Sequence, residues 1–147
     1  MALATVASGA QAANDDTLRD NATIHTRKLQ TELMVAALYC GQQVRYNAFI
    51  QRFSGELIAN GKELRTLFVN MHGAKRAVPQ LDTFLTKMAN EASQRRLTAG
   101  ASYCREAQSL FTQVLSLPVR QLIAFASDRA RAPQTQGRLT YLQIPGL

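Results

Sequence analysis

The stretches LYCG (residues 38–41) and SYCR (residues 102–105) contain both cysteines of this 147-residue chain, each directly after a tyrosine. A zinc site usually takes four Cys or His ligands from close pairs, whereas Cys40, Cys104, His25 and His72 are isolated from one another in the sequence. The C-x-x-C motif of redox proteins is also missing. Two interpretations of the cysteines remain. They form one disulfide between distant segments, or they are two buried thiols.

The compartment decides between these interpretations, because disulfides persist in oxidising compartments and are rare in the cytosol. The chain opens with small apolar residues that close on Ala10-Gln11-Ala12 and then change to the acids Asp15 and Asp16. This is the form of the last part of a secretory signal with its A-x-A cleavage box, although the cationic opening is missing. Either the true start lies upstream of Met1 or this is a flexible Ala-rich terminus. We favour export, which predicts a periplasmic or secreted protein.

In an exported chain, two cysteines on the apolar phase of their helices most simply form one bridge, Cys40–Cys104. Closing a loop of this length would restrict the unfolded chain by about 4 kcal/mol on the chain-entropy model. Tyr39 and Tyr103 are then expected to pack around the bridge.

Helical periodicity dominates the body of the chain. Pro79 is the one proline before Pro118, and apolar residues recur at spacings of three and four. The predicted fold class is all-α, a helical bundle of four main helices plus a short fifth, with one disulfide. We predict helices over about residues 24–40, 44–72, 80–97 and 103–117, the last capped by Ser102, and a short helix from about 118 to 128.

The predicted helix over residues 44–72 carries the clearest pattern, with one apolar face from Tyr46 to Met71. Its weak point is Asn60-Gly61, because Asn-Gly is a favoured turn dipeptide. The apolar face nevertheless keeps its phase across this pair. We therefore predict an unbroken helix in which Asn60 forms a hydrogen bond across a helix contact, followed by a connection over residues 74–79.

Three segments are expected along the chain. Residues 1–13 are the remnant of a signal peptide or a disordered N-terminus, residues 14–128 form the helical bundle domain, and residues 129–147 form an extended C-terminal tail. The last ten residues either dock on the bundle or extend into solvent. The cap of the first helix is Thr17, Asn21 or Thr23, and the sequence does not choose among them.

The formal net charge is +7, from 17 Lys and Arg against 10 Asp and Glu. This sign favours anionic partners such as nucleic acid, anionic lipid or an acidic protein. The basic residues are scattered, and neither a helix-turn-helix spacing nor an aromatic platform accompanies them, so nucleic acid is not the expected partner. No stretch approaches the roughly 18 apolar residues that cross a bilayer, so we do not expect an integral membrane protein.

Few residues qualify for catalysis or ligand binding. His25 and His72 occur in no nucleophile or metal motif, and we expect His25 to be exposed and His72 to stabilise a helix C-terminus. Asn60, Asn90 and Glu91 are candidates for a polar pocket between helices. Because nucleotide, haem and phosphate-loop fingerprints are missing, we predict no catalytic residue, no metal site and no cofactor.

Residues 33–40, 46–53 and 85–93 resemble small exported helical proteins of Gram-negative bacteria that carry no assigned activity. The resemblance covers about residues 29–117 and brings no catalytic residues to this chain. It favours export and the Cys40–Cys104 bridge.

These features predict a non-enzymatic exported binding or structural module of the bacterial cell envelope, with an envelope protein or an anionic surface as its partner. The alternative is a small ligand-binding or hydrolase-like periplasmic protein with a polar pocket between helices. A second alternative is a cytosolic basic nucleic-acid-binding protein, which would have free thiols. A cavity lined by converging polar side chains favours the pocket protein, and a filled core with an exposed apolar patch favours the envelope module. The sequence does not indicate the oligomeric state.

Overall fold

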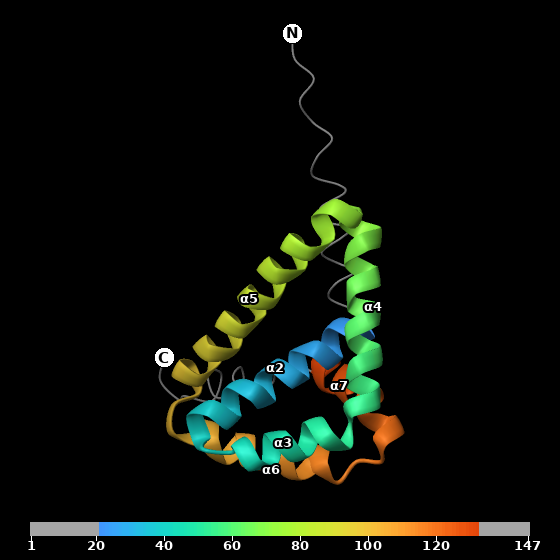
Figure 1. Ribbon diagram of the computed structural model, residues 1–147. Helices are drawn as coiled ribbons and strands as arrows, with labels where there is room; N and C mark the ends of the chain where they lie inside the picture. Colours follow the sequence, from blue (N-terminus) through green and yellow to red (C-terminus); the bar gives the residue numbers. More distant parts are fainter. Residues whose placement is uncertain (1–20, 133–147) are drawn as a thin grey trace.

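The structure is a computed structural model that describes residues 21–132. This part of the chain is all-helical, which confirms the all-α class of the prediction; the described residues form six α-helices and not the predicted four main helices plus a short fifth (Figure 1). The predicted segment 1–13 and most of the predicted tail 129–147 lie outside the described residues. The α-helices are α2 (Ala22–Cys40), α3 (Gln43–Arg52), α4 (Ser54–His72), α5 (Ala74–Ala99), α6 (Tyr103–Leu115) and α7 (Leu122–Arg131), with the 3₁₀-helices η1 (Gly100–Ser102) and η2 (Val119–Gln121) before α6 and α7.

Helix α2 is the centre of the fold and contacts each of the other five α-helices. Of the three possible caps, Asn21 caps it, because the Asn21 side chain accepts hydrogen bonds from the backbone N–H groups of Thr23 (2.8 Å) and Ile24 (3.4 Å). The helix ends at Cys40, where Gly41 adopts the left-handed conformation with φ 66°. The chain then reverses into α3.

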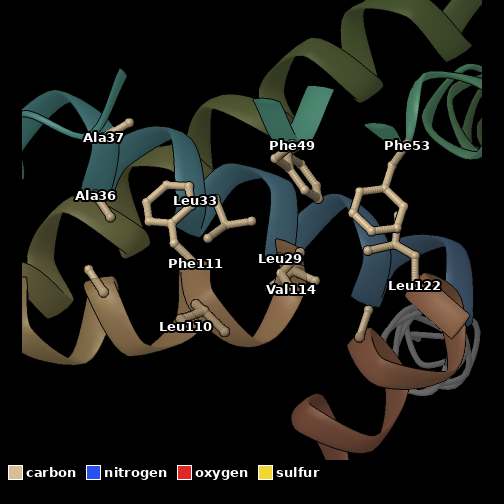
Figure 2. Packing of buried hydrophobic residues seen from close by; sticks show 12 residues of the cluster. Leu29, Leu33, Ala36, Ala37, Phe49, Phe53, Leu110, Phe111, Val114 and Leu122 are labelled. Carbon is tan, nitrogen blue, oxygen red and sulfur yellow. The ribbon is translucent and has the colours of Figure 1, made fainter. Parts of the chain in front are cut away.

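Two apolar clusters share α2. The main cluster lies between α2, α3, α6 and α7, and Figure 2 shows its side chains interdigitating between these helices. A second, smaller cluster joins the start of α2 to α4 and α5. In Figure 1, α4 and α5 form two sides of a triangle, and the other helices form its base. The fully buried members of the main cluster are Leu33, Phe49, Phe53, Phe111, Val114 and Leu122.

The predicted helix over residues 44–72 is interrupted at Phe53, which separates α3 from α4. The break has a packing reason, because Phe49 and Phe53 belong to the main cluster whereas Leu64 and Phe68 belong to the second. Asn60-Gly61 does lie inside one continuous helix, as predicted. The Asn60 amide Nδ2 donates to the backbone oxygen of Thr23 across the contact with α2 (3.1 Å), which confirms the predicted hydrogen bond.

Two further helix boundaries and one helix cap differ from the prediction. Residues 74–79 are the start of α5 and not a connection: Pro79 lies inside the helix, where it removes one backbone hydrogen bond, and Ala77 is buried in the second cluster. The Ser102 side chain does not cap α6; its hydroxyl lies within hydrogen-bond distance of the Ala99 oxygen and the Glu106 carboxylate instead. Helix α7 continues to Arg131, so the predicted tail begins as helix.

None of the described helices combines the length and the apolar character needed to cross a membrane.

Glu32, in the middle of α2, is the acid of both ion pairs seen within residues 21–132. Its carboxylate lies 3.1 Å from Nη2 of Arg95 on α5 and 3.5 Å from Nη2 of Arg129 on α7. One side chain of the central helix therefore holds two outer helices.

Replacing Glu32→Gln should lower the free energy of unfolding by about 1 kcal/mol, because both pairs are partly exposed and screened by solvent. Urea unfolding measures the loss, which should shrink at high salt. Glu91→Gln is the matched control, since Glu91 is exposed on α5 and forms no ion pair in the described part of the chain. Equal losses in the two variants would contradict the role of Glu32.

Candidate functional site

The predicted disulfide is present. Cys40 and Cys104 are bonded, with their Cα atoms 5.5 Å apart, and the bridge spans 64 positions of the sequence. It joins the last residue of α2 to the first turn of α6. A disulfide indicates an oxidising, non-cytosolic location.

The two tyrosines beside the bridge have different surroundings. Tyr39 is 51% exposed, and the guanidinium carbon of Arg96 lies 3.7 Å from the centre of its ring, which is a cation–π contact. Tyr103 packs against the main cluster. Burial raises the pKa of the Tyr103 hydroxyl above its ordinary value of 10.0, the Glu32 carboxylate raises this pKa further, and Arg95 and Arg96 lower it.

A groove of about 480 Å³ opens between the start of α3 and the outer face of α6. It lies next to the disulfide in the sequence, because Gln42 follows Cys40 by two residues and Arg105 directly follows Cys104. The bridge therefore ties the two walls of the groove together. All of the lining residues are polar and none is acidic; they are Gln42, Arg45, Arg105, Gln108, Ser109 and Thr112.

The two arginines of the groove are held differently. Arg45 reaches from α3 to α6, where its Nη1 donates to the backbone oxygen of Gln108 (3.2 Å) and lies 3.5 Å from Oγ1 of Thr112. These contacts fix the guanidinium in place and leave its other N–H groups for a ligand. Arg105 is exposed, and its side chain has no hydrogen bond or ion pair to another residue in the described part of the chain.

The surroundings of the groove add to its positive potential. Helix α3 starts without an acidic residue in its first turn and without a side-chain cap, so its first backbone N–H groups are unsatisfied by side chains. The acid nearest to Arg105 in sequence is Glu106. Its carboxylate accepts a hydrogen bond from the Ser102 hydroxyl (2.8 Å) and does not line the groove. Arginine side chains bind carboxylates and phosphates through paired N–H groups. The groove is therefore suited to an anionic oxygen group.

The three predicted pocket residues do not line this groove. Asn60 is buried between α4 and α2, where its amide is engaged by Thr23, whereas Asn90 and Glu91 are exposed on α5. A pocket formed by these three residues stays a prediction.

The histidines lie away from the groove. The expectation that His25 is exposed is wrong, because only 5% of His25 is exposed. Its neighbours Ile24 and Thr26 are also buried, so the start of α2 is covered by other helices. His72 is the last residue of α4, as predicted, and its ring centre lies 5.6 Å from that of Phe68. Within residues 21–132, no group of three His, Cys, Asp or Glu is arranged to hold a metal ion.

The groove residues were not predicted from the sequence. Arg105, Ser109 and Thr112 are spaced by four and three residues, so the sequence does indicate that they share one polar face of the predicted fourth helix. No pattern links this face to Arg45, which belongs to the polar side of the predicted helix over residues 44–72. The contact between α3 and α6 brings them together.

Comparison of the chain with protein-family models, with curated proteins and with solved structures finds no significant match. Its function is therefore inferred from the disulfide and from the groove.

Replacing both cysteines (Cys40→Ala with Cys104→Ala) should lower the free energy of unfolding by about 4 kcal/mol, because the unfolded chain regains the freedom of a long loop. Denaturant unfolding of the oxidised wild type and of the variant measures the difference. The reduced wild type is the control and should show a similar loss. A loss well under 1 kcal/mol in both would contradict a stabilising role for the bridge.

The raised pKa of Tyr103 predicts a loss of stability in alkali. Folding favours the neutral form of the Tyr103 hydroxyl. The contribution of this group to the free energy of unfolding is therefore full below pH 10 and is lost as the pH rises through the folded-state pKa. Tyr103→Phe should make stability fall less steeply above pH 10 and should remove the last phase of the tyrosinate absorbance titration. Tyr39→Phe is the control, because it also removes one tyrosine but should keep that phase. If the phase disappears in Tyr39→Phe and stays in Tyr103→Phe, it does not belong to Tyr103 and the prediction is wrong.

Proposed function

We propose that this protein is a non-enzymatic binding protein of a bacterial cell envelope, periplasmic or secreted, which holds an anionic partner at the groove between α3 and α6. The observation that carries the proposal is the lining of the groove. Two arginines converge there with four uncharged polar side chains and no carboxylate.

The charge of the protein supports an anionic partner. The chain carries a net +7, and both ion pairs within the described residues use Glu32, so Arg45 and Arg105 are not neutralised by an acid there. A cleft lined by one sign of charge attracts ligands of the opposite sign and raises their association rate.

The disulfide supports export, because a bridge between the ends of two core helices persists in an oxidising compartment. It also argues against the cytosolic nucleic-acid-binding alternative, which requires free thiols; within residues 21–132 both cysteines are bonded.

The same groove bears on the pocket alternative. The groove is open to solvent, and its polar lining supports binding of a ligand at the surface over a purely structural role. Hydrolysis is less well supported, because Ser109 shares the groove with neither a histidine nor a carboxylate that would activate its hydroxyl. A small anionic molecule in this groove is therefore the second candidate function.

Heparin, a soluble polyanion, provides a direct test of anion binding. Arg105→Gln should weaken heparin binding about fivefold, the effect of one basic side chain near an anionic surface. Arg65→Gln removes the same charge from an exposed position on α4, away from the groove, and should have a smaller effect. Equal weakening would assign binding to the net charge of the protein and contradict a site at the groove.

Export is tested on the protein from its native cell, by intact mass with thiol alkylation before and after reduction. Export predicts a shortened N-terminus and two alkylated cysteines only after reduction. An unprocessed chain with both thiols open to alkylation at once would overturn this part of the proposal.

A further inference from the structure

We infer that the partner held at the groove is the surface of an anionic lipid bilayer. This inference rests on the proposed function and names its partner. It is carried by large apolar side chains that stand exposed around the turn between α2 and α3, beside the arginines of the groove.

The apolar side chains flank Gly41, where the chain reverses. Leu38 is 67% exposed at the end of α2, and Val44 is 84% exposed in the first turn of α3, directly before Arg45 of the groove. Tyr39, half exposed, lies between them in sequence. Single exposed apolar residues are ordinary on a protein surface; what distinguishes this turn is that exposed apolar side chains stand on both sides of it, next to the arginines of the groove.

Three arginines surround this turn. Arg45 and Arg105 line the groove, and Arg96 lies on the ring of Tyr39. Glu106 is the acid in the first turn of α6, where its carboxylate accepts a hydrogen bond from the Ser102 hydroxyl. Positive charge therefore exceeds negative charge beside the exposed apolar side chains.

The turn belongs to a rigid corner of the molecule. Figure 1 shows the end of α2 and the start of α3 at one corner of the triangle, where the end of α5 and the start of α6 also lie. The disulfide joins α2 to α6 there, and the Arg96–Tyr39 contact joins α5 to α2. Side chains that protrude from a fixed corner can enter a surface with little loss of conformational freedom.

A bilayer matches both features of this corner. Anionic headgroups supply phosphate oxygens for the arginines, and the apolar phase begins within the depth of one headgroup, where Leu38 and Val44 can insert. A soluble polyanion would engage the arginines and leave the apolar side chains in water. An acidic protein could satisfy both features, and it is one outcome of the test.

The test uses the fact that the chain contains no tryptophan. Val44→Trp places a single fluorescent indole on the corner, and Leu38→Trp is a second probe in case the first variant fails to fold. Vesicles of phosphatidylcholine with phosphatidylglycerol should shift the emission of either probe to the blue, and vesicles of phosphatidylcholine alone should not. Adding Arg105→Gln to the Val44→Trp chain should weaken vesicle binding about fivefold.

Ile58→Trp is the matched control, because Ile58 is 62% exposed but lies on α4. Its emission should not shift with either vesicle. A shift as large as that of Val44→Trp would indicate adsorption without a defined face and would overturn the inference.

The proposed function and this inference fail separately. If heparin binding depends on Arg105 but neither corner probe shifts with anionic vesicles, the inference is overturned, and the partner is a soluble anion or an acidic protein. If the protein binds neither heparin nor anionic vesicles, both are overturned. Vesicle binding with a blue shift at the corner alone supports both.

Discussion

Covering α2 on all sides is the constraint on which the rest of this structure depends. Its buried residues run from Ile24 in the first turn to Ala37 in the last and point to more than one side, so no single neighbour can shield them from water. The buried threonines of α2 are compatible with this position, because Thr26 and Thr31 donate to backbone oxygens one turn earlier, at 2.9 and 3.0 Å. The other helices are arranged around α2 as a consequence, in two clusters that both include residues of α2.

The two clusters explain the shape of the molecule. Helices α3 and α6 close the main cluster on one part of α2, while α4 and α5 reach the other part near its start. The break at Phe53 changes the direction of the chain between α3 and α4, with Phe49 buried in the main cluster and Phe68 in the second (Figure 1). Glu32 then joins the later part of α5 to α2, which closes the triangle seen in Figure 1.

The disulfide connects this architecture to a function. It joins the end of the central helix to α6 at the point where α3 begins, and so sets the distance between the walls of the groove. Polar residues face outward on both walls because their helices bury their other faces, and neutralising acids are missing from the lining. Leu38 and Val44, on the two sides of the same turn, are exposed and belong to neither cluster.

The sequence by itself determined what depends on local patterns. Apolar residues at spacings of three and four identified an all-α chain with helix ends at residues 40 and 72, and two isolated cysteines in helical phase predicted the bridge that the structure contains. The unbroken helix at Asn60-Gly61 also followed from the phase of its apolar face. Only the tertiary structure decided the break at Phe53, the burial of His25 and the meeting of Arg45 with the polar face of α6. These depend on which helices are neighbours, and helical periodicity records which face is buried but not against which partner.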